Sequence, residues 1–246
     1  MSPWQHSNLC EENNMAKAQW FDVTLPLNKE IPIPPAIPPQ PGQPLPPEFS
    51  IPPSTVYRFF DVDRGDKVTM SRIEITSHDG THIDAPLHFI PGGATIDAML
   101  YDTTIGPCRV IEIKNDTSVT AKELEPYRIR AGERILFKTK NSPHVWSMKQ
   151  YTGKFVTISL EAARYLAEKK IRLVGIDYIS VASADPMENV NEVHKTFLGN
   201  GIYILEALNL AGIKPGKYDL FCLPLRIERG DAGPCRVLLR KRMSKM

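Results

Sequence analysis

Three histidines lie within eleven residues of a short stretch, SHDGTHIDAPLHF, that begins at Ser77, and an aspartate lies two residues beyond the second of them. They are His78, His82, Asp84 and His88, and the whole chain has only six histidines. Imidazole nitrogens and a carboxylate oxygen suit Zn²⁺, and also Mn²⁺ or Fe²⁺. Three protein ligands leave positions open for water, as in catalytic metal sites. The cluster therefore predicts a catalytic metal site, with a hydrogen-bonded polar cluster or a histidine-rich surface loop as the alternatives.

The spacing of these residues favours an extended chain over a helix. Histidines four apart share one face of a helix in HEXXH metalloproteases, but here Gly80 lies between them and Pro86 follows closely. In an extended segment, residues two apart point the same way, so His82 and Asp84 are expected to share a face. A turn at Gly80 would fold His78 back toward them, because glycine has unusual backbone freedom.

His88 lies six residues beyond His82 and is free for another role. An imidazole near a metal-activated water is suited to moving protons, so His88 is predicted to be catalytic. Thr81 and Asp177 are candidates for a hydrogen bond behind the ligands that fixes an imidazole tautomer. The alternative for both is ordinary hydrogen bonding at a turn or a strand end.

A second histidine and carboxylate lie in the segment VHKTFLGNGIYILEAL. His194 and Glu206 are twelve residues apart, on either side of a predicted helix end. Glu206 lies in an apolar run, where a buried charge must be paired or bound to a metal. The alternative is that Glu206 opens a helix near Leu205 and faces solvent.

The elements that must position these residues are short β-branched runs and a few amphipathic stretches. Runs bounded by Gly, Pro, Asn or Asp are predicted to be strands, at residues 70–76, 109–113, 134–139, 155–159, 171–177, 218–227 and 235–241. Thr120 and Glu123 form a capping box that opens one helix, and Ser159 caps a second. A third helix is predicted within 189–201, ended by a glycine. The mixture predicts one α/β domain with a mixed sheet or a compact barrel.

Length, composition and charge limit the function classes that remain. The chain has 246 residues, 42% hydrophobic and 24% charged, which suits one domain with a substantial core over residues 15–246. A net charge of +2 does not suggest nucleic acid or an acidic membrane as a partner. No apolar run approaches the ~18 residues of a membrane helix, and we find no signal peptide. Four separated cysteines fit free thiols in a reducing compartment, so we expect a cytoplasmic protein. The partner that we expect is a small-molecule substrate.

Two N-terminal segments depart from this globular pattern. Residues 1–14 are polar and patternless, so we expect a disordered extension, unless translation begins at Met15. Twelve of the 22 prolines lie in residues 26–53. Because proline lacks an amide hydrogen and has a fixed φ, this insertion cannot be a helix or an inner strand. We expect it to wrap the domain, to reach across a dimer interface, or to form a wall of the substrate pocket.

The stretch HDGTHIDAPLHF resembles the HxGTHxDxPxHF signature of the metal-dependent cyclase family, which includes bacterial kynurenine formamidase and isatin hydrolase. The resemblance extends to LVGIDYISV, HKTFLGNGIYILEAL and GKYDLFCLPLRIERGDAGPCRVLL, and covers residues 66–240. It implies a fold of the swivelling β/β/α type, with a mixed, barrel-like sheet flanked by helices. It also implies a homodimer or a homotetramer.

The resemblance implies a role for each candidate residue. The implied ligands of one or two Zn²⁺ ions, with Mn²⁺ as the alternative, are His78, His82, Asp84, His194 and Glu206. Of these, Asp84 and Glu206 would touch or bridge both ions, and His88 would be the catalytic histidine. The implied reaction is hydrolysis of a small-molecule amide by a metal-activated water, as in an arylformamidase. The alternatives are an isatin-type lactam or lactone hydrolase and a non-catalytic metal-binding module.

The N-terminal third departs from the family pattern. Kynurenine formamidases carry a WPGD-like stretch ahead of the signature, and its tryptophan contacts substrate. We find no clear equivalent in this chain. The aromatic residues expected to contact substrate in its place are Trp20, Tyr57, Phe59 and Phe60.

Overall fold

The computed structural model describes residues 18–28, 54–144, 155–183 and 187–242. Its strands are β1 (Trp20–Asp22), β2 (Thr55–Phe60), β3 (Met70–Glu74), β4 (His82–Asp84), β5 (Ile105–Glu112), β6 (Ser118–Val119), β7 (Arg134–Lys138), β8 (Thr157–Ile158), β9 (Leu173–Ile176), β10 (Tyr203–Glu206), β11 (Gly216–Pro224) and β12 (Ala232–Lys241). Its helices are α1 (Tyr101–Thr104), α2 (Ala121–Leu124), α3 (Asn141–His144), α4 (Leu160–Glu168) and α5 (Met187–Leu198). None of these helices is both long and apolar enough to cross a membrane. The predictions for residues 1–14, for Met15 and for most of the proline-rich insertion lie outside the described residues.

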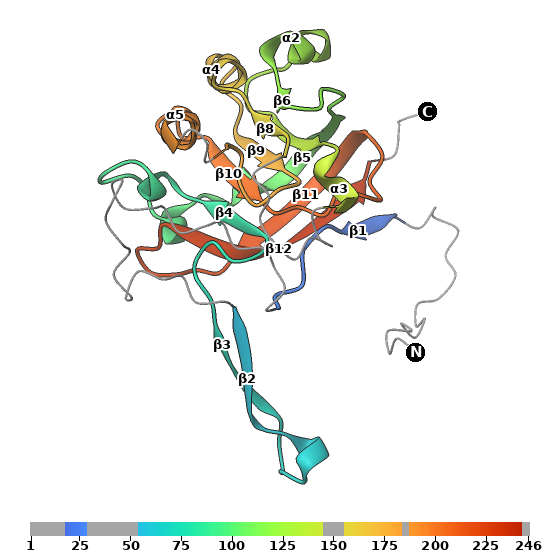
Figure 1. The fold of residues 1–246 in the computed structure, drawn as a ribbon, viewed down its shortest axis with the longest axis vertical. Helices are drawn as coiled ribbons and strands as arrows, with labels where there is room; N and C mark the ends of the chain where they lie inside the picture. The colour runs from blue at the N-terminus through green and yellow to red at the C-terminus, as the bar shows by residue number, and fades with distance from the viewer. Residues whose placement is uncertain (1–17, 29–53, 145–154, 184–186, 243–246) are drawn as a thin grey trace.

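Seven strands close into a mixed barrel. Hydrogen-bonded neighbours follow the order β12-β11-β5-β7-β9-β10-β4, and β4 pairs again with β12, which closes the ring. The neighbours β5, β7, β9 and β10 are parallel, whereas the other pairs in the ring are antiparallel. The short strand β1 adds to β12 outside the ring. The predicted α/β domain with a mixed, barrel-like core flanked by helices is confirmed (Figure 1).

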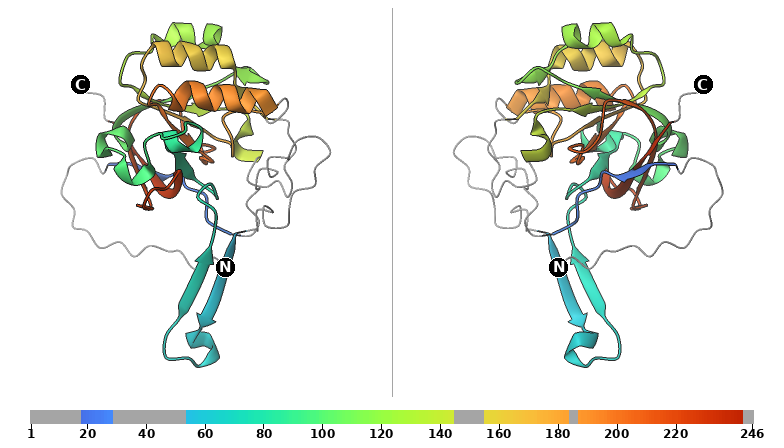
Figure 2. Two further views of the ribbon diagram at one scale, coloured as in Figure 1. Left: turned by 90° about the vertical axis from the view of Figure 1, so that its left-hand side faces the viewer. Right: turned by 90° about the vertical axis from the view of Figure 1, so that its right-hand side faces the viewer.

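Alternation along the strands separates two apolar cores. In β7, Ile135 and Phe137 belong to one cluster together with Leu166 of α4 and Phe197 of α5. Between them, Leu136 belongs to a second cluster, which fills the inside of the barrel. Helices α2, α4 and α5 lie together over one side of the barrel (Figure 2). Each strand under these helices therefore has an inner face and an outer, helix-facing side.

The helices begin and end where their capping residues predict. The hydroxyl of Thr120 accepts a hydrogen bond from the backbone N–H of Glu123, at 3.2 Å, and opens α2. The hydroxyl of Ser159 accepts one from the N–H of Ala162, at 3.1 Å, and opens α4. Beyond α5 the chain turns through Gly201, whose φ of 70° is left-handed and favours glycine. All three predicted helices are confirmed.

Five strands were not predicted, namely β1, β2, β4, β6 and β10, and two of them, β4 and β10, carry ligand candidates. Both β4 and β10 are short and hold charged side chains, so neither shows the apolar alternation that marks a strand. The alternative in which Glu206 opens a solvent-facing helix is wrong, because Glu206 ends β10 and is only 4% exposed. Tertiary pairing, and not local propensity, makes these segments strands.

Strands β2 and β3 form a hairpin that projects from the barrel (Figure 1). Every residue of both strands is exposed. Large apolar side chains are nevertheless frequent in and around it, namely Val56, Tyr57, Phe59, Phe60, Val62, Val68, Met70 and Ile73. A two-stranded hairpin of this kind has little stability of its own in water.

Gly175 in β9 is predicted to tolerate no side chain. A Cβ atom there would lie 2.6 Å from Cδ2 of Leu136 and 3.1 Å from Cδ1 of Leu208, both inside the barrel. Overpacking of this kind costs about 1–3 kcal/mol, so Gly175→Ala should lower the free energy of unfolding by that amount in urea denaturation. Gly212→Ala is the control, because a Cβ there meets no atom within 4 Å. Equal destabilisation of the two variants would contradict the prediction.

Candidate metal centre

The predicted ligands meet on the outer face of the barrel, next to helix α5. Ile83 packs in the inner core, so alternation along β4 turns His82 and Asp84 to the outer face. The register pairs His82 with Glu206 of β10. His194 comes from α5 and lies 3.6 Å, from Nε2 to Oε1, from Glu206. Barrel closure thus brings together segments that lie more than a hundred residues apart.

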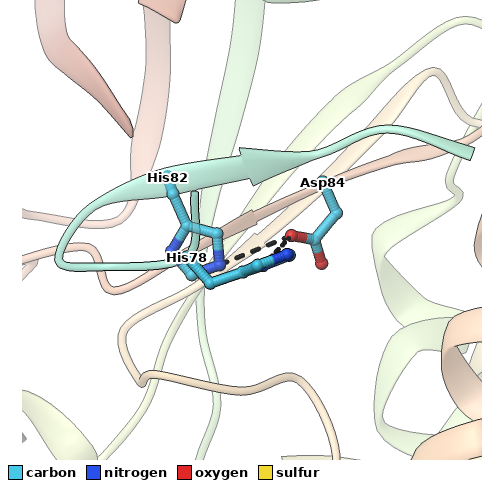
Figure 3. Close-up of side chains that lie close together, drawn as sticks. All are labelled: His78, His82 and Asp84. Carbon is cyan, nitrogen blue, oxygen red and sulfur yellow. Dashed lines mark ion pairs between the residues drawn. The ribbon is translucent and has the colours of Figure 1, made fainter. Parts of the chain in front are cut away.

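The turn at Gly80 folds His78 back onto β4, as expected (Figure 3). Gly80 has a φ of 64°, which other residues rarely adopt. One carboxylate oxygen, Oδ1 of Asp84, lies 3.0 Å from Nδ1 of His78 and 3.4 Å from Nε2 of His82. The three side chains offer ligand atoms that all lie within 4.8 Å of one another.

A second set of potential ligands shares Asp84 with the first. Asp84, His194 and Glu206 also offer atoms within 4.8 Å of one another, and all three are buried. The two oxygens of Glu206 face different histidines, with Oε2 at 3.3 Å from Nε2 of His82 and Oε1 toward His194. The carboxylates of Asp84 and Glu206 therefore each lie within 3.6 Å of two histidine rings.

Backbone carbonyl groups set the tautomers of two imidazoles. Nδ1 of His82 donates to the carbonyl oxygen of Gly80 at 2.8 Å, and Nδ1 of His194 donates to that of Val190 at 2.8 Å. Because a carbonyl oxygen only accepts, the proton lies on Nδ1, and a neutral ring presents its Nε2 lone pair. Nε2 of each ring then faces the carboxylates. Hydrogen bonds of this kind, made by the ring nitrogen that does not bind the metal, orient histidine ligands in metal sites.

Buried polar atoms without partners mark the position of a cation. Among the described residues, Nε2 of His82 and both carboxylate oxygens of Asp84 are buried and have no hydrogen-bond partner. A buried carboxylate is costly unless it is paired or binds a metal. Imidazole nitrogens and carboxylate oxygens that converge in this way fit a divalent cation of the class that prefers mixed nitrogen and oxygen ligands. The site is built for a divalent metal.

Asp231, which the sequence analysis did not single out, completes the cluster. Its Oδ2 lies 2.8 Å from Nε2 of His78 and 3.6 Å from Nδ1 of His88. The rings of His78 and His88 are 4.0 Å apart between centroids. Asp231 immediately precedes β12, which pairs with β4. In the sequence it is part of the polar stretch IERGD, which looks like a surface loop, so only strand pairing reveals it.

His88 lies at the solvent edge of the cluster, together with His78 and Asp231. It ends the short 3-10 helix Pro86–His88, and 26% of its side chain is exposed. The ring of Phe89 lies 4.5 Å from the rings of both His88 and His194, and stacks on the latter. The ring of Phe89 therefore covers one side of the cluster, and His88 lies between the ligands and solvent.

Thr81 and Asp177 are buried, and their hydrogen bonds hold loops in place. The hydroxyl of Thr81 donates to the carbonyl oxygen of Ala207 at 2.6 Å and accepts from the N–H of Leu25 at 2.9 Å. Asp177 accepts from the N–H and the hydroxyl of Thr139, both at 2.8 Å, and burial raises its pKa to about 6. These contacts match the turn and strand-end alternative.

The aromatic residues expected to contact substrate lie elsewhere in the chain. Trp20 pairs with Arg240 of β12, whereas β4 pairs with the other end of that strand at Ala232. The two positions are about 26 Å apart along the strand, at ~3.3 Å per residue. Phe59 and Phe60, like Tyr57, lie in the projecting hairpin (Figure 1). The structure therefore does not bring these four rings to the metal centre of their own chain. Trp20 lies beside the far end of β12, and the other three rings lie on the projecting hairpin.

In the metal-free protein, the neighbouring carboxylates raise the pKa values of His78 and His82. Burial lowers the pKa of His82, but Asp84 and Glu206 outweigh it and raise the pKa to about 10. Burial acts in the same way on His78, and Asp231 and Asp84 raise its pKa to about 9. At neutral pH the metal-free site is a set of imidazolium–carboxylate pairs.

Metal binding is predicted to release protons and to strengthen as the pH rises. The cation must displace the protons that His78 and His82 keep up to about pH 9 and 10. We expect the Zn²⁺ or Mn²⁺ affinity of chelator-stripped protein to rise between about pH 6 and pH 9. Titration calorimetry in buffers of different ionisation enthalpy counts the protons. His82→Ala should release fewer of them, and an affinity independent of pH would contradict the prediction.

Comparison with known proteins places the whole barrel in one family. Residues 21–183 match the cyclase family model, described as "Putative cyclase". The chain is 31% identical over 227 residues to kynurenine formamidase of Bacillus cereus, and the alignment covers 92% of this chain and 99% of that protein.

Solved structures share the fold over most of the chain. A protein described as a "predicted metal-dependent hydrolase" from Bacillus stearothermophilus is 33% identical with a TM-score of 0.73, covering 92% of this chain and 100% of that chain. Isatin hydrolase A from Labrenzia aggregata is 25% identical with a TM-score of 0.73, covering 91% of this chain and 93% of that one. The family model, the sequence relatives and the shared barrel agree with the resemblance in the histidine stretch: the chain belongs to the cyclase family.

Proposed function

We propose that the protein is a metal-dependent hydrolase that cleaves the C–N bond of a small-molecule amide, as an arylformamidase does. The observation that carries this proposal is the buried carboxylate of Asp84, which is common to two converging ligand sets. Similarity to kynurenine formamidase over nearly the full length of both chains favours a formamide substrate. Similarity to isatin hydrolase A keeps lactam or lactone opening as the second candidate.

The proposed cation is Zn²⁺, with Mn²⁺ as the alternative, and the ligand sets provide for one ion or two. His78, His82 and Asp84 would hold the first ion, and Asp84, His194 and Glu206 would hold the second. When bound, a divalent cation polarises a carbonyl oxygen and lowers the pKa of a coordinated water to about 7.

The chain's own residues orient the ligands and move the proton. Hydrogen bonds to backbone carbonyl groups hold Nε2 of His82 and His194 toward the carboxylates. His88, at the solvent edge of the cluster, is placed to take a proton from the attacking water and to return it to the leaving nitrogen. The carboxylate of Asp231, 3.6 Å from Nδ1 of His88, stabilises the imidazolium that forms.

We further infer that the protein works as a homodimer or homotetramer. The exposed apolar side chains of the β2–β3 hairpin support this, since a patch of this kind usually marks an interface. At the base of the hairpin, a cavity of about 640 Å³ is lined by apolar residues that include Leu25, Ile73 and Leu225. A second copy of the hairpin is a suitable occupant. The three cysteines of the described residues are free and buried, which fits the proposed cytoplasmic location.

Activity should depend on the metal and on His88. Protein stripped with a chelator is expected to regain hydrolysis of formanilide-type amides, isatin or small lactones when Zn²⁺ or Mn²⁺ is added. His88→Ala should keep its metal, measured by elemental analysis, and lose about 10²–10⁴-fold in kcat. His82→Ala is the matched variant that should lose metal. No bound metal, and no metal-restored activity on any of these substrates, would overturn the proposal.

Asp231→Asn tests the carboxylate that touches two histidines. The amide keeps the shape and one acceptor oxygen but removes the charge beside His78 and His88. A residue behind a metal ligand typically contributes about 10–100-fold to activity or metal affinity, so we expect a loss of kcat in that range with the metal retained. Asp219→Asn, which removes a carboxylate paired with Arg240, is the control and should keep full activity. Unchanged kcat in Asp231→Asn would exclude a positioning role.

A further inference from the structure

A second cavity in the molecule is lined mostly by basic side chains. Its volume is about 380 Å³. Only one carboxylate, that of Glu133, lines it, against six basic side chains: Arg109, Arg128, Arg130, Arg134, Lys217 and Arg242. The whole chain has a net charge of only +2, so the structure gathers positive charge at this place.

This basic cavity and the metal centre lie at opposite ends of the parallel strands. Arg134, the first residue of β7, pairs with Leu173 of β9, which pairs with Tyr203, the first residue of β10. Glu206 of the metal centre is the last residue of β10. The basic cavity therefore opens near the amino ends of these strands, whereas the metal centre lies at their carboxyl ends. It shares no lining residue with the ligand sets.

Arg134 provides a buried positive charge in the wall of the cavity. It is only 7% exposed. Its Nε donates to the carbonyl oxygen of Thr103 at 2.8 Å, its Nη1 donates to that of Pro107 at 3.2 Å, and its Nη2 donates to that of Asp102. These acceptors are neutral carbonyl groups. The carboxylate of Asp102 also acts on this charge, but it is itself paired with Arg172. A buried guanidinium whose charge is only partly balanced favours an anion nearby.

Two of the other arginines are only partly compensated. Arg109 pairs with Glu133, yet its Nε is buried without a hydrogen-bond partner among the described residues. Nε of Arg242 lies 3.4 Å from Oδ1 of Asp219, and the other oxygen of that carboxylate pairs with Arg240. Within the described part of the chain, three of the lining residues make no ion pair: Arg128, Arg130 and Lys217.

We propose that the basic cavity binds a small polyanion that carries at least two phosphate groups. Guanidinium groups present paired N–H donors that match the geometry of phosphate oxygens. One phosphate carries a charge of about −2, which would leave most of the lining charge unbalanced, whereas a pyrophosphate group balances about twice as much. The volume is in the range of small-molecule sites and cannot enclose a macromolecule. Tyr127 also lines the cavity and is the candidate contact for a ligand that carries a base.

Titration calorimetry on the full chain with its metal bound tests this proposal. The probes are inorganic pyrophosphate, ADP, inorganic phosphate and citrate. We expect one pyrophosphate per chain, bound at least tenfold more tightly than phosphate or citrate. Equal affinities for ADP and pyrophosphate would assign recognition to the phosphates alone, and tighter ADP binding would assign a base contact to Tyr127. Both results support the proposal.

The matched variants separate the cavity from general charge effects. Arg128→Asn with Lys217→Ser removes two lining charges, and asparagine tolerates the φ of 48° at position 128. Lys170→Asn with Lys122→Ser removes two exposed charges outside the cavity, and position 170 has a similar φ of 53°. Pyrophosphate should bind at least tenfold more weakly to the first pair and within twofold of the parent to the second.

Three results would overturn the proposal. They are an absence of pyrophosphate binding, citrate binding as tight as that of pyrophosphate, and pyrophosphate affinity that the cavity variant leaves unchanged. The last result would place the phosphate on the metal centre.

Discussion

One buried carboxylate, that of Asp84, constrains the rest of this structure. It lies in β4, the three-residue strand that pairs with both β10 and β12 and so closes the barrel. The two neighbouring strands bring the other acids of the site, because Glu206 ends β10 and Asp231 precedes β12. A carboxylate that is fully buried needs positive charge around it. The surrounding histidines, and a cation when it is bound, provide that charge. The strand pairing of β4 that closes the barrel therefore also assembles the site.

The metal centre depends on contacts that hold its ligands from behind. Carbonyl groups at Gly80 and Val190 fix two imidazole rings, and Thr81 ties the histidine turn to the end of β10 through Ala207. In each contact the acceptor is a backbone carbonyl oxygen. The Nε2 atoms and the carboxylate oxygens are therefore already held close together before a cation arrives, which lowers the cost of ordering them.

Charge is distributed unevenly about the barrel although the chain is nearly neutral. Carboxylates and histidines gather at the carboxyl ends of the parallel strands, which is where α/β folds commonly place their reaction sites. Basic side chains gather near the amino ends, around Arg134. The net charge of +2 conceals this separation.

The sequence by itself determined what depends on neighbours along the chain. The spacing of two between His82 and Asp84 puts both on one face of any extended strand, Gly80 permits the turn that returns His78, and Thr120 and Ser159 cap the helices that follow them. The closing strands β4 and β10, the place of Asp231 and the remoteness of Trp20 and Phe59 were decided only by the tertiary structure. Strand pairing depends on partners far away in the chain. Strands as short as β4 and β10, which also hold charged side chains, have too little local strand preference to be predicted from the sequence.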